Sequence, residues 1–188
     1  MPNWRRAFLP GGMFFFTVVT YQRHPLFQSS LARQLLGDAI RKTRQIQPFT
    51  IEAIVLLPDH LHTIWALPRG DADFSGRWSW IKREFTTQWL AAGGAEKDTT
   101  SAQSSDRRRG VWQRKYWEHS ISDEDEMIAL LDYIHFNPVK HGHARCPADW
   151  EWSSFHKWVR RGQYEPDWGC REPFDESKHA PLKEIVGE

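Results

Sequence analysis

The sequence lacks features that would assign it at once to several large classes of protein. Its apolar run at 13–19 is short, and no stretch approaches the roughly 18 apolar residues that a membrane span requires. Its two cysteines, Cys146 and Cys170, have no Cys-x-x-Cys spacing, so neither a zinc ribbon nor a disulfide framework is predicted. A reducing cytoplasm is therefore expected. The net charge of +1 provides no overall field that would attract a polyanion.

What is present is an ordinary globular composition with an excess of tryptophan. The 188 residues suit one domain with an appendage, and 40% hydrophobic with 26% charged residues is typical of a folded protein. Eleven tryptophans are far above average usage. Some of them must build the core, but aromatic side chains also stack on unpaired bases.

Apolar periodicity divides the chain into strands and amphipathic helices. Aromatic and β-branched runs predict strands, the last of them a charged edge strand, at 14–21, 49–57, 61–67 and 111–121. Helical spacing predicts helices that begin near 30, 75 and 123. The order β-α-β-β-α-β is that of the ferredoxin-like fold, an α+β class with an antiparallel sheet, and the helix from 123 is an addition laid on that sheet.

The predicted organisation is a main domain at 1–143 and a tryptophan-rich C-terminal tail at 144–188 that packs on it. The tail is predicted to hold one short helix around 153–161. A flexible loop is predicted at about 91–110, because its Gly, Ser and Thr residues show no periodicity. On the second helix, three cations are expected to be available to solvent, either as a solvated helix face or for contact with phosphate: Arg77, Lys82 and Arg83.

His60 and His62 are the first candidate site residues. Alternate side chains of a strand point to one face, so these two imidazoles project together, with Cα atoms roughly 6–7 Å apart. That separation allows them to share one cation. Histidine pairs of this kind also arise without a metal, and nine histidines in the chain raise that chance.

Tyr133 and Asn137 lie four residues apart on the helix from 123 and therefore occupy one face. If that face packs against the histidine strand, Asn137 offers a carbonyl oxygen as a third ligand. A mixed nitrogen and oxygen site suits Mg²⁺ or Mn²⁺ holding a phosphate. Tyr133 would then be a nucleophile that forms a covalent phosphotyrosine. The alternatives are a core tyrosine and a helix-ending asparagine before Pro138.

Several motifs together are similar to those of a known family. They are Leu57-Pro58-Asp59-His60-Leu61-His62 with Trp65, Trp112-Gln113 with Tyr116-Trp117-Glu118-His119, and Asp132-Tyr133-Ile134 with Asn137-Pro138-Val139-Lys140-His141-Gly142. Asp73-Phe74-Ser75 with Arg77-Trp78 and, in the tail, Asp149-Trp150 with Ser153-Ser154-Phe155-His156 also match. The chain resembles the bacterial REP-associated tyrosine transposases, a branch of the single-tyrosine HUH transposases.

This resemblance implies roles for individual residues. His60, His62 and Asn137 would be metal ligands, and Tyr133 would be the nucleophile of a catalytic domain at 1–143. The implied substrate is single-stranded DNA around repeated extragenic palindromic (REP) hairpins, with cleavage and strand transfer as the activity. Family relatives include monomers and pairs that exchange catalytic helices, so a monomer and a homodimer both stay open. The implied location is the cytoplasm, in association with the nucleoid.

Clustered cations are further candidates for nucleic-acid contact: Arg5, Arg6, Arg83, Arg108, Arg114, Lys115 and Lys140. Glu118 and His119 are interpreted as structural residues of the edge strand. Two other functions compete with strand transfer. One is a catalytically silent module that binds hairpin DNA or RNA. The other is a metal-dependent nuclease that uses water and leaves no protein on the DNA end.

Overall fold

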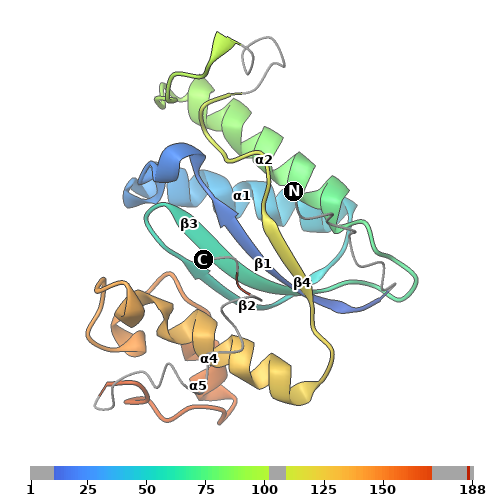
Figure 1. Ribbon diagram of the computed structural model, residues 1–188, viewed down its shortest axis with the longest axis vertical. Helices are drawn as coiled ribbons and strands as arrows, with labels where there is room; N and C mark the ends of the chain where they lie inside the picture. The colour runs from blue at the N-terminus through green and yellow to red at the C-terminus, as the bar shows by residue number, and fades with distance from the viewer. Residues whose placement is uncertain (1–10, 102–108, 171–185, 187–188) are drawn as a thin grey trace.

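A four-stranded antiparallel sheet organises the computed structural model, which describes residues 11–101, 109–170 and 186. The strand order is β2-β3-β1-β4 (Figure 1). The strands are β1 Met13–Val19, β2 Thr50–Leu56, β3 His60–Ala66 and β4 Trp117–Ser120. This is the ferredoxin-like order, which confirms the predicted α+β class and places β4 at an edge.

Helices cover both faces of the sheet (Figure 1). Helices α1, Ser30–Ile46, and α2, Phe74–Ala91, pack on one face, and α4, Glu124–Lys140, packs on the other. A short helix, α5, spans Phe155–Arg160 as predicted for the tail. Short 3₁₀ helices among the described residues lie at Tyr21–Arg23, Leu26–Gln28 and Pro147–Asp149. No described helix has the length and hydropathy to cross a bilayer.

The alternation of side chains along β1 separates two cores. Phe14 and Phe16 face α1 and α2, where Phe16 packs 4.9 Å from Trp65 between ring centroids. Trp65 in turn stacks on Trp78 at 4.3 Å. Phe15 points to the other face and packs with α4. Part of the tryptophan excess is thus explained by the larger core, since Trp65 and Trp78 are both 1% exposed.

The three long helices begin within one residue of the positions predicted from the sequence. Ser29, Asp73 and Asp123 are the N-caps, and each side chain accepts a hydrogen bond from the backbone N–H three residues later. The helices begin at Ser30, Phe74 and Glu124, where the sequence predicted starts near 30, 75 and 123. At its other end α4 continues through Pro138 to Lys140, which keeps the last candidate site residues on the helix.

Arg77 is buried, which contradicts the expectation that it is available to solvent. Its guanidinium donates to both carboxylate oxygens of Asp71, at 3.0 and 2.6 Å, and to the carbonyls of Gln47, Pro48 and Asp73. The hydrogen bond with Arg77 lowers the pKa of Asp71. The cation therefore fastens the loop before α2 to the segment before β2.

The two remaining cations of this helix behave differently from each other. Lys82 is half-buried, and its amine donates to the carbonyl of Gln113 at 3.0 Å, so it also departs from the expected solvent position. Arg83 is exposed as predicted.

The described part of the tail docks on the outer edge of β2. The N–H of Leu56 donates to the carbonyl of Trp152 at 2.9 Å, and the indole N–H of Trp158 donates to the carbonyl of Glu52 at 3.0 Å. Ser154 also joins tail and helix, because its hydroxyl lies 2.9 Å from Nε2 of the buried His135 on α4. These contacts satisfy strand groups that would otherwise form an open edge.

Cys146 and Cys170 form a disulfide, which corrects the expectation that no such bond is present. They are 24 residues apart in sequence, but the fold of the tail brings their Cα atoms to 4.5 Å. Sequence spacing alone does not report this proximity.

The predicted flexible loop is only partly described, because residues 102–108 lie outside the described residues. Its two described ends are tied together. Arg109 pairs with Glu96, and the N–H of Lys97 donates to the carbonyl of Gly110 at 3.0 Å.

Replacing Arg77 with Ala is expected to lower the free energy of unfolding by about 3 kcal/mol, because Asp71 and three carbonyls lose a buried charged donor. Chemical denaturation of the purified protein measures the change. The exposed Arg83 on the same helix is the matched control, and its replacement with Ala should change stability by less than about 0.5 kcal/mol. Equal effects of the two substitutions would contradict the anchoring role of Arg77.

Candidate active site

His60 and His62 lie side by side on the face of β3 that α4 covers. The antiparallel register pairs His60 with Val19 and His62 with Thr17 on β1. Both histidines are buried, at 1% and 0% exposure, and their ring centroids are 4.9 Å apart. The strand alternation predicted from the sequence therefore brings the two imidazoles together.

Tyr133 lies next to this pair. Its ring centroid is 5.2 Å from that of His62 and 6.1 Å from that of Phe15, so α4 lays the phenol against the histidine strand. Asn137 follows one turn later and is completely buried. Within the described part of the chain, neither polar atom of the Asn137 side chain has a hydrogen-bond partner. A buried amide with both atoms unsatisfied is costly and needs an explanation.

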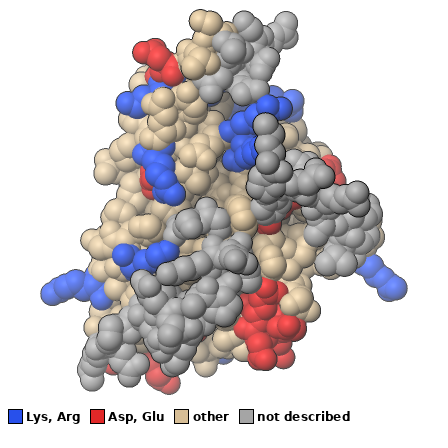
Figure 2. All heavy atoms as spheres, in the orientation of Figure 1, with Lys and Arg blue, Asp and Glu red and all other residues tan. Residues whose placement is uncertain are grey.

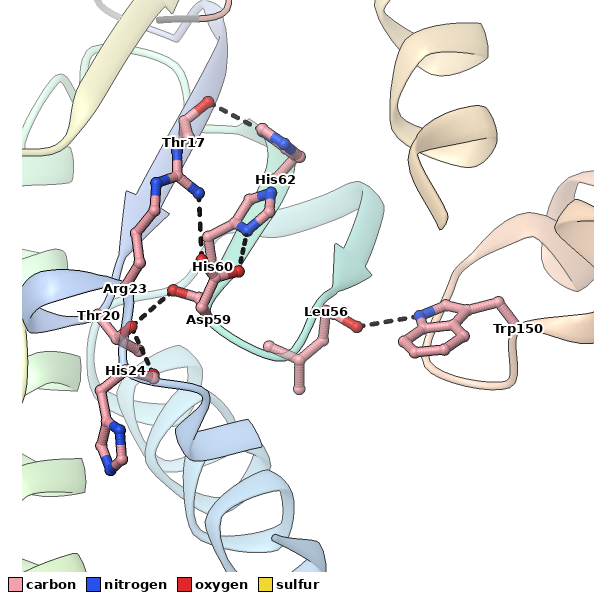
Figure 3. Close-up of polar contacts among 9 residues, drawn as sticks. All are labelled: Thr17, Thr20, Arg23, His24, Leu56, Asp59, His60, His62 and Trp150. Carbon is pink, nitrogen blue, oxygen red and sulfur yellow. Dashed lines mark hydrogen bonds and ion pairs between the residues drawn. The ribbon is translucent and has the colours of Figure 1, made fainter. Parts of the chain in front are cut away.

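Hydrogen bonds to Nδ1 fix the proton on each imidazole (Figure 3). Asp59 Oδ1 lies 2.6 Å from Nδ1 of His60, and Arg23 donates to Oδ2 of the same carboxylate. Burial by itself would raise the pKa of Asp59, but His60 and Arg23 outweigh it and lower the pKa to about 2. Asp59 is thus a carboxylate that only accepts, so Nδ1 of His60 carries the hydrogen.

The same argument applies to His62. The hydroxyl of Thr17 donates its only proton to the carbonyl of Val186 at 2.7 Å. The contact of 2.9 Å between Thr17 Oγ1 and Nδ1 of His62 must therefore use the hydrogen on the ring. When these histidines are neutral, the lone pair is therefore on Nε2, the tautomer in which a histidine binds a metal while its other nitrogen donates to the protein.

These residues fit a divalent cation with mixed ligands. Two imidazole nitrogens and one amide oxygen, from Asn137, are suitable donors for Mg²⁺ or Mn²⁺ with further positions open to a phosphate. No cluster of three His, Cys, Asp or Glu side chains arranged for a metal occurs among the described residues. The candidate centre therefore depends on the unsatisfied amide of Asn137 as the third ligand.

Two neighbours at the end of α4 complete the site. The amine of Lys140 donates to the phenol oxygen of Tyr133 at 3.4 Å. Lys140 was predicted only as a nucleic-acid contact. The ring of His141 lies 5.3 Å from that of His60, and sequence reasoning gave His141 no role. Its spacing of four residues from Asn137 was the available signal, because positions i and i+4 share a helix face. Lys140 and His141 are exposed, so the site opens to solvent at this end.

The other candidate cations are not gathered at Tyr133. Arg83, Arg114 and Lys115 are exposed on α2 and on the segment before β4. Arg5, Arg6 and Arg108 lie outside the described residues. His119 pairs with Glu126 in the first turn of α4, at 2.6 Å, a contact that ties the edge strand to the helix.

Comparison with known proteins shows close relatives along nearly the whole chain. A REP-associated tyrosine transposase of Escherichia coli K12 is 40% identical over 168 residues, which are 89% of this chain and 91% of the relative. A Haemophilus influenzae protein assigned to the same group is 37% identical over 90% of this chain and 94% of its own length. No protein-family model matches the chain.

A solved structure agrees with these relatives. The REP-associated tyrosine transposase bound to a REP hairpin superimposes with a TM-score of 0.73 and 37% identity, covering 93% of this chain and 96% of that one. Fold and relatives together define a transposase enzyme. More specifically, the chain belongs to the REP-associated tyrosine transposases, as the resemblance of its motifs predicted.

Asp59 is expected to set the metal affinity of His60 through the hydrogen bond to Nδ1. Replacing Asp59 with Asn removes the negative charge, and the affinity for Mn²⁺ should fall by about 10-fold or more. Isothermal titration of the purified protein with Mn²⁺ measures this directly. Asp38, an exposed partner of Arg41 on α1, is the control, and its replacement with Asn should leave the affinity unchanged. An unaltered Mn²⁺ affinity in the Asp59 variant would refute the role.

Proposed function

We propose that the protein is a metal-dependent endonuclease and strand transferase for single-stranded DNA at REP-type hairpins, and that Tyr133 forms a covalent 5′-phosphotyrosine intermediate. The observation that carries the proposal is the position of the Tyr133 ring, 5.2 Å from the ring of His62 and within hydrogen-bond reach of Lys140. A hairpin as substrate is supported by the relative whose structure is bound to a REP hairpin.

The residues of the site divide the chemistry among them. His60, His62 and Asn137 would hold Mg²⁺ or Mn²⁺, which when bound polarises a phosphoryl oxygen of the scissile phosphate. Lys140 places a positive charge beside the phenol oxygen and stabilises the negative charge that this oxygen carries as it loses its proton. Asp59 and Thr17 keep the histidines in the neutral tautomer that leaves Nε2 for the ion.

The reaction exchanges one phosphodiester for another. The phenol oxygen of Tyr133 bonds to phosphorus, the bond to the 3′ oxygen of the upstream nucleotide breaks, and that oxygen takes up a proton to become a free hydroxyl. A phenol, with a pKa near 10, is a better leaving group than a sugar alcohol. The 3′ hydroxyl of a second strand can therefore attack the phosphotyrosine and release the enzyme, which joins two strands.

The burial of Tyr133 favours one alternative. Its side chain is 4% exposed and packs in the smaller core with Phe15, as expected for a structural tyrosine. A hairpin DNA or RNA-binding module without catalysis would keep such a core. That alternative predicts hairpin affinity indifferent to metal and no covalent product.

The proposed substrate also indicates where in the cell the protein would act. DNA hairpins as the substrate would place the protein in the cytoplasm with the nucleoid. It would act there as a monomer or a homodimer.

A covalent protein–DNA adduct is the expected product when the wild-type protein is incubated with a REP-type hairpin carrying single-stranded flanks and Mn²⁺. Denaturing gels with end-labelled DNA detect it. Replacing Tyr133 with Phe removes the nucleophilic oxygen and should abolish the adduct. A Tyr116→Phe control removes a phenol oxygen that lies beside Ser75, away from the candidate site, and should retain the adduct. An adduct formed by the Tyr133 variant would exclude that residue as nucleophile, and cleavage without any adduct would favour attack by water.

Lys140 is expected to accelerate adduct formation. Replacing Lys140 with Gln removes the charge beside the phenol oxygen, and the single-turnover rate should fall at least about 10-fold. The rate profile against pH should also move to higher pH, because the phenolate loses a stabilising cation. A Lys42→Gln control, on α1 and paired with Glu84, should leave rate and profile unchanged. A loss of DNA affinity with a normal rate at saturating DNA would instead assign Lys140 to binding alone.

A further inference from the structure

A cavity of about 550 Å³ lies on the side of the sheet opposite to Tyr133. Its walls are the outer side of α2 and the segment at 109–114 that leads to β4, together with Tyr21 after β1. Its volume is in the range of small-ligand sites, roughly 300–1,000 Å³. Figure 2 shows one group of Lys and Arg side chains in the upper part of the molecule, where Figure 1 draws α2, and others scattered lower down.

Four cations and no described Asp or Glu line this cavity: Lys82, Arg83, Arg109 and Arg114. Arg109 is neutralised by Glu96, but in the described part of the chain the other three have no carboxylate partner. Lys82 donates to the carbonyl of Gln113 and lies 5.2 Å from the ring centroid of Tyr116. Burial lowers the pKa of Lys82 to about 8. An anion in the cavity would compensate charges that the protein leaves unbalanced.

The other lining groups suit a base and a sugar. Tyr21 and Trp112 line the cavity with aromatic rings, of which Trp112 is 8% exposed and also part of the larger core. Leu90 is apolar, and Thr86 and Thr87 carry hydroxyls. Cations beside aromatic faces are the combination with which proteins hold unpaired nucleotides, because every base has a face that can stack. A duplex presents its phosphates on a convex surface with the bases hidden, so it would leave the aromatic walls unused.

The cavity is linked to the histidine end of the sheet. Trp112 forms a bridge with Thr20, the residue after β1, and the N–H of Gln113 donates to the carbonyl of Val19. Val19 is the register partner of His60, and the N–H of Thr20 donates to the carbonyl of Asp59 at 2.9 Å. A DNA strand that leaves the cavity at this end of the sheet can therefore pass around the end of the sheet toward His60.

We propose that this cavity binds one unpaired nucleotide of the single-stranded flank of the hairpin, with its phosphate at Lys82, Arg83 and Arg114 and its base on Trp112 and Tyr21. The choice of DNA rests on the proposed function. The position of the cavity makes it a second contact, separate from the site of Tyr133, that holds the flank while the cleavable phosphate lies on the other face.

Binding of fluorescent hairpins to Tyr133→Phe protein tests the proposal without cleavage. Adding Arg83→Gln and Arg114→Gln should weaken binding to a hairpin with single-stranded flanks by about 10-fold or more. The slope of log affinity against log salt should fall by about 1.4, since each single-strand phosphate contact contributes about 0.7. Binding to the same hairpin without flanks should not change. The matched control removes two exposed cations elsewhere, through Arg41→Gln and Arg160→Gln, and should leave both affinities as they were.

A second measurement leaves the protein side chains of the cavity intact. Abasic sites placed one at a time along the flank should identify a position where loss of the base weakens binding about 5- to 150-fold. Equal weakening of flanked and unflanked hairpins by the Arg83 and Arg114 substitutions would assign these cations to the stem and overturn the proposal. Unchanged affinities, or a flank with no sensitive position, would overturn it as well.

The two proposals fail in different ways. Absence of a Tyr133 adduct with wild-type protein, together with flank-dependent binding, would refute catalysis and leave the cavity as a nucleotide site. A normal adduct with flank-independent binding would refute only the cavity.

Discussion

The antiparallel pairing of β1 with β3 is the constraint on which the rest of the structure depends. Because side chains alternate along both strands, one register sends Phe14, Phe16 and Trp65 into the core beneath α1 and α2 and turns His60 and His62 toward α4. A slip of one residue in β3 would turn the histidines into the core beneath α1 and α2 and would turn Trp65 toward α4. The apolar core on one face therefore holds the candidate active site on the other in place, and stability and chemistry are set by the same hydrogen-bonded ladder.

The polar side chains of the candidate site are almost completely buried. Groups buried to this extent need hydrogen-bond partners or a bound ion. Asn137, His60 and His62 are at most 1% exposed, and desolvating an amide without a partner costs on the order of 1–3 kcal/mol. Neighbouring groups reduce this cost for the histidines, since Asp59 and Thr17 accept their ring hydrogens. Nothing comparable is described for Asn137. An Asn137 side chain without a hydrogen-bond partner is physically reasonable if it binds a cation together with the two histidines. In a purely structural core, the same unsatisfied amide would be selected against.

Much of the fold and the main residues of the candidate site could be predicted from the sequence because they follow from local periodicity. Strand alternation placed His60 and His62 together, and helical spacing put Tyr133 and Asn137 on one face. What could not be predicted depends on contacts between distant segments. The burial of Arg77 requires the carbonyls of Gln47 and Pro48, which approach only after folding. The disulfide joins residues 24 apart, and nothing in their spacing shows that the tail turns back between them. The proton on His62 depends on the carbonyl of Val186, which lies 124 positions further along the chain than the histidine itself.

The nearly neutral net charge is consistent with a protein that holds DNA at a few points. A uniformly basic surface would bind any duplex through its phosphates, with affinity that falls steeply with salt. In this structure, carboxylates neutralise several of the described cations. Asp71 pairs with Arg77, and Glu96 pairs with Arg109. Arg83 and Arg114 have no carboxylate partner among the described residues, so their positive charges are not neutralised. For the proposed function, discrimination between a stem and its unpaired flank would benefit from this arrangement, because the binding energy would come from a few positions where geometry, and not total charge, decides which strand fits.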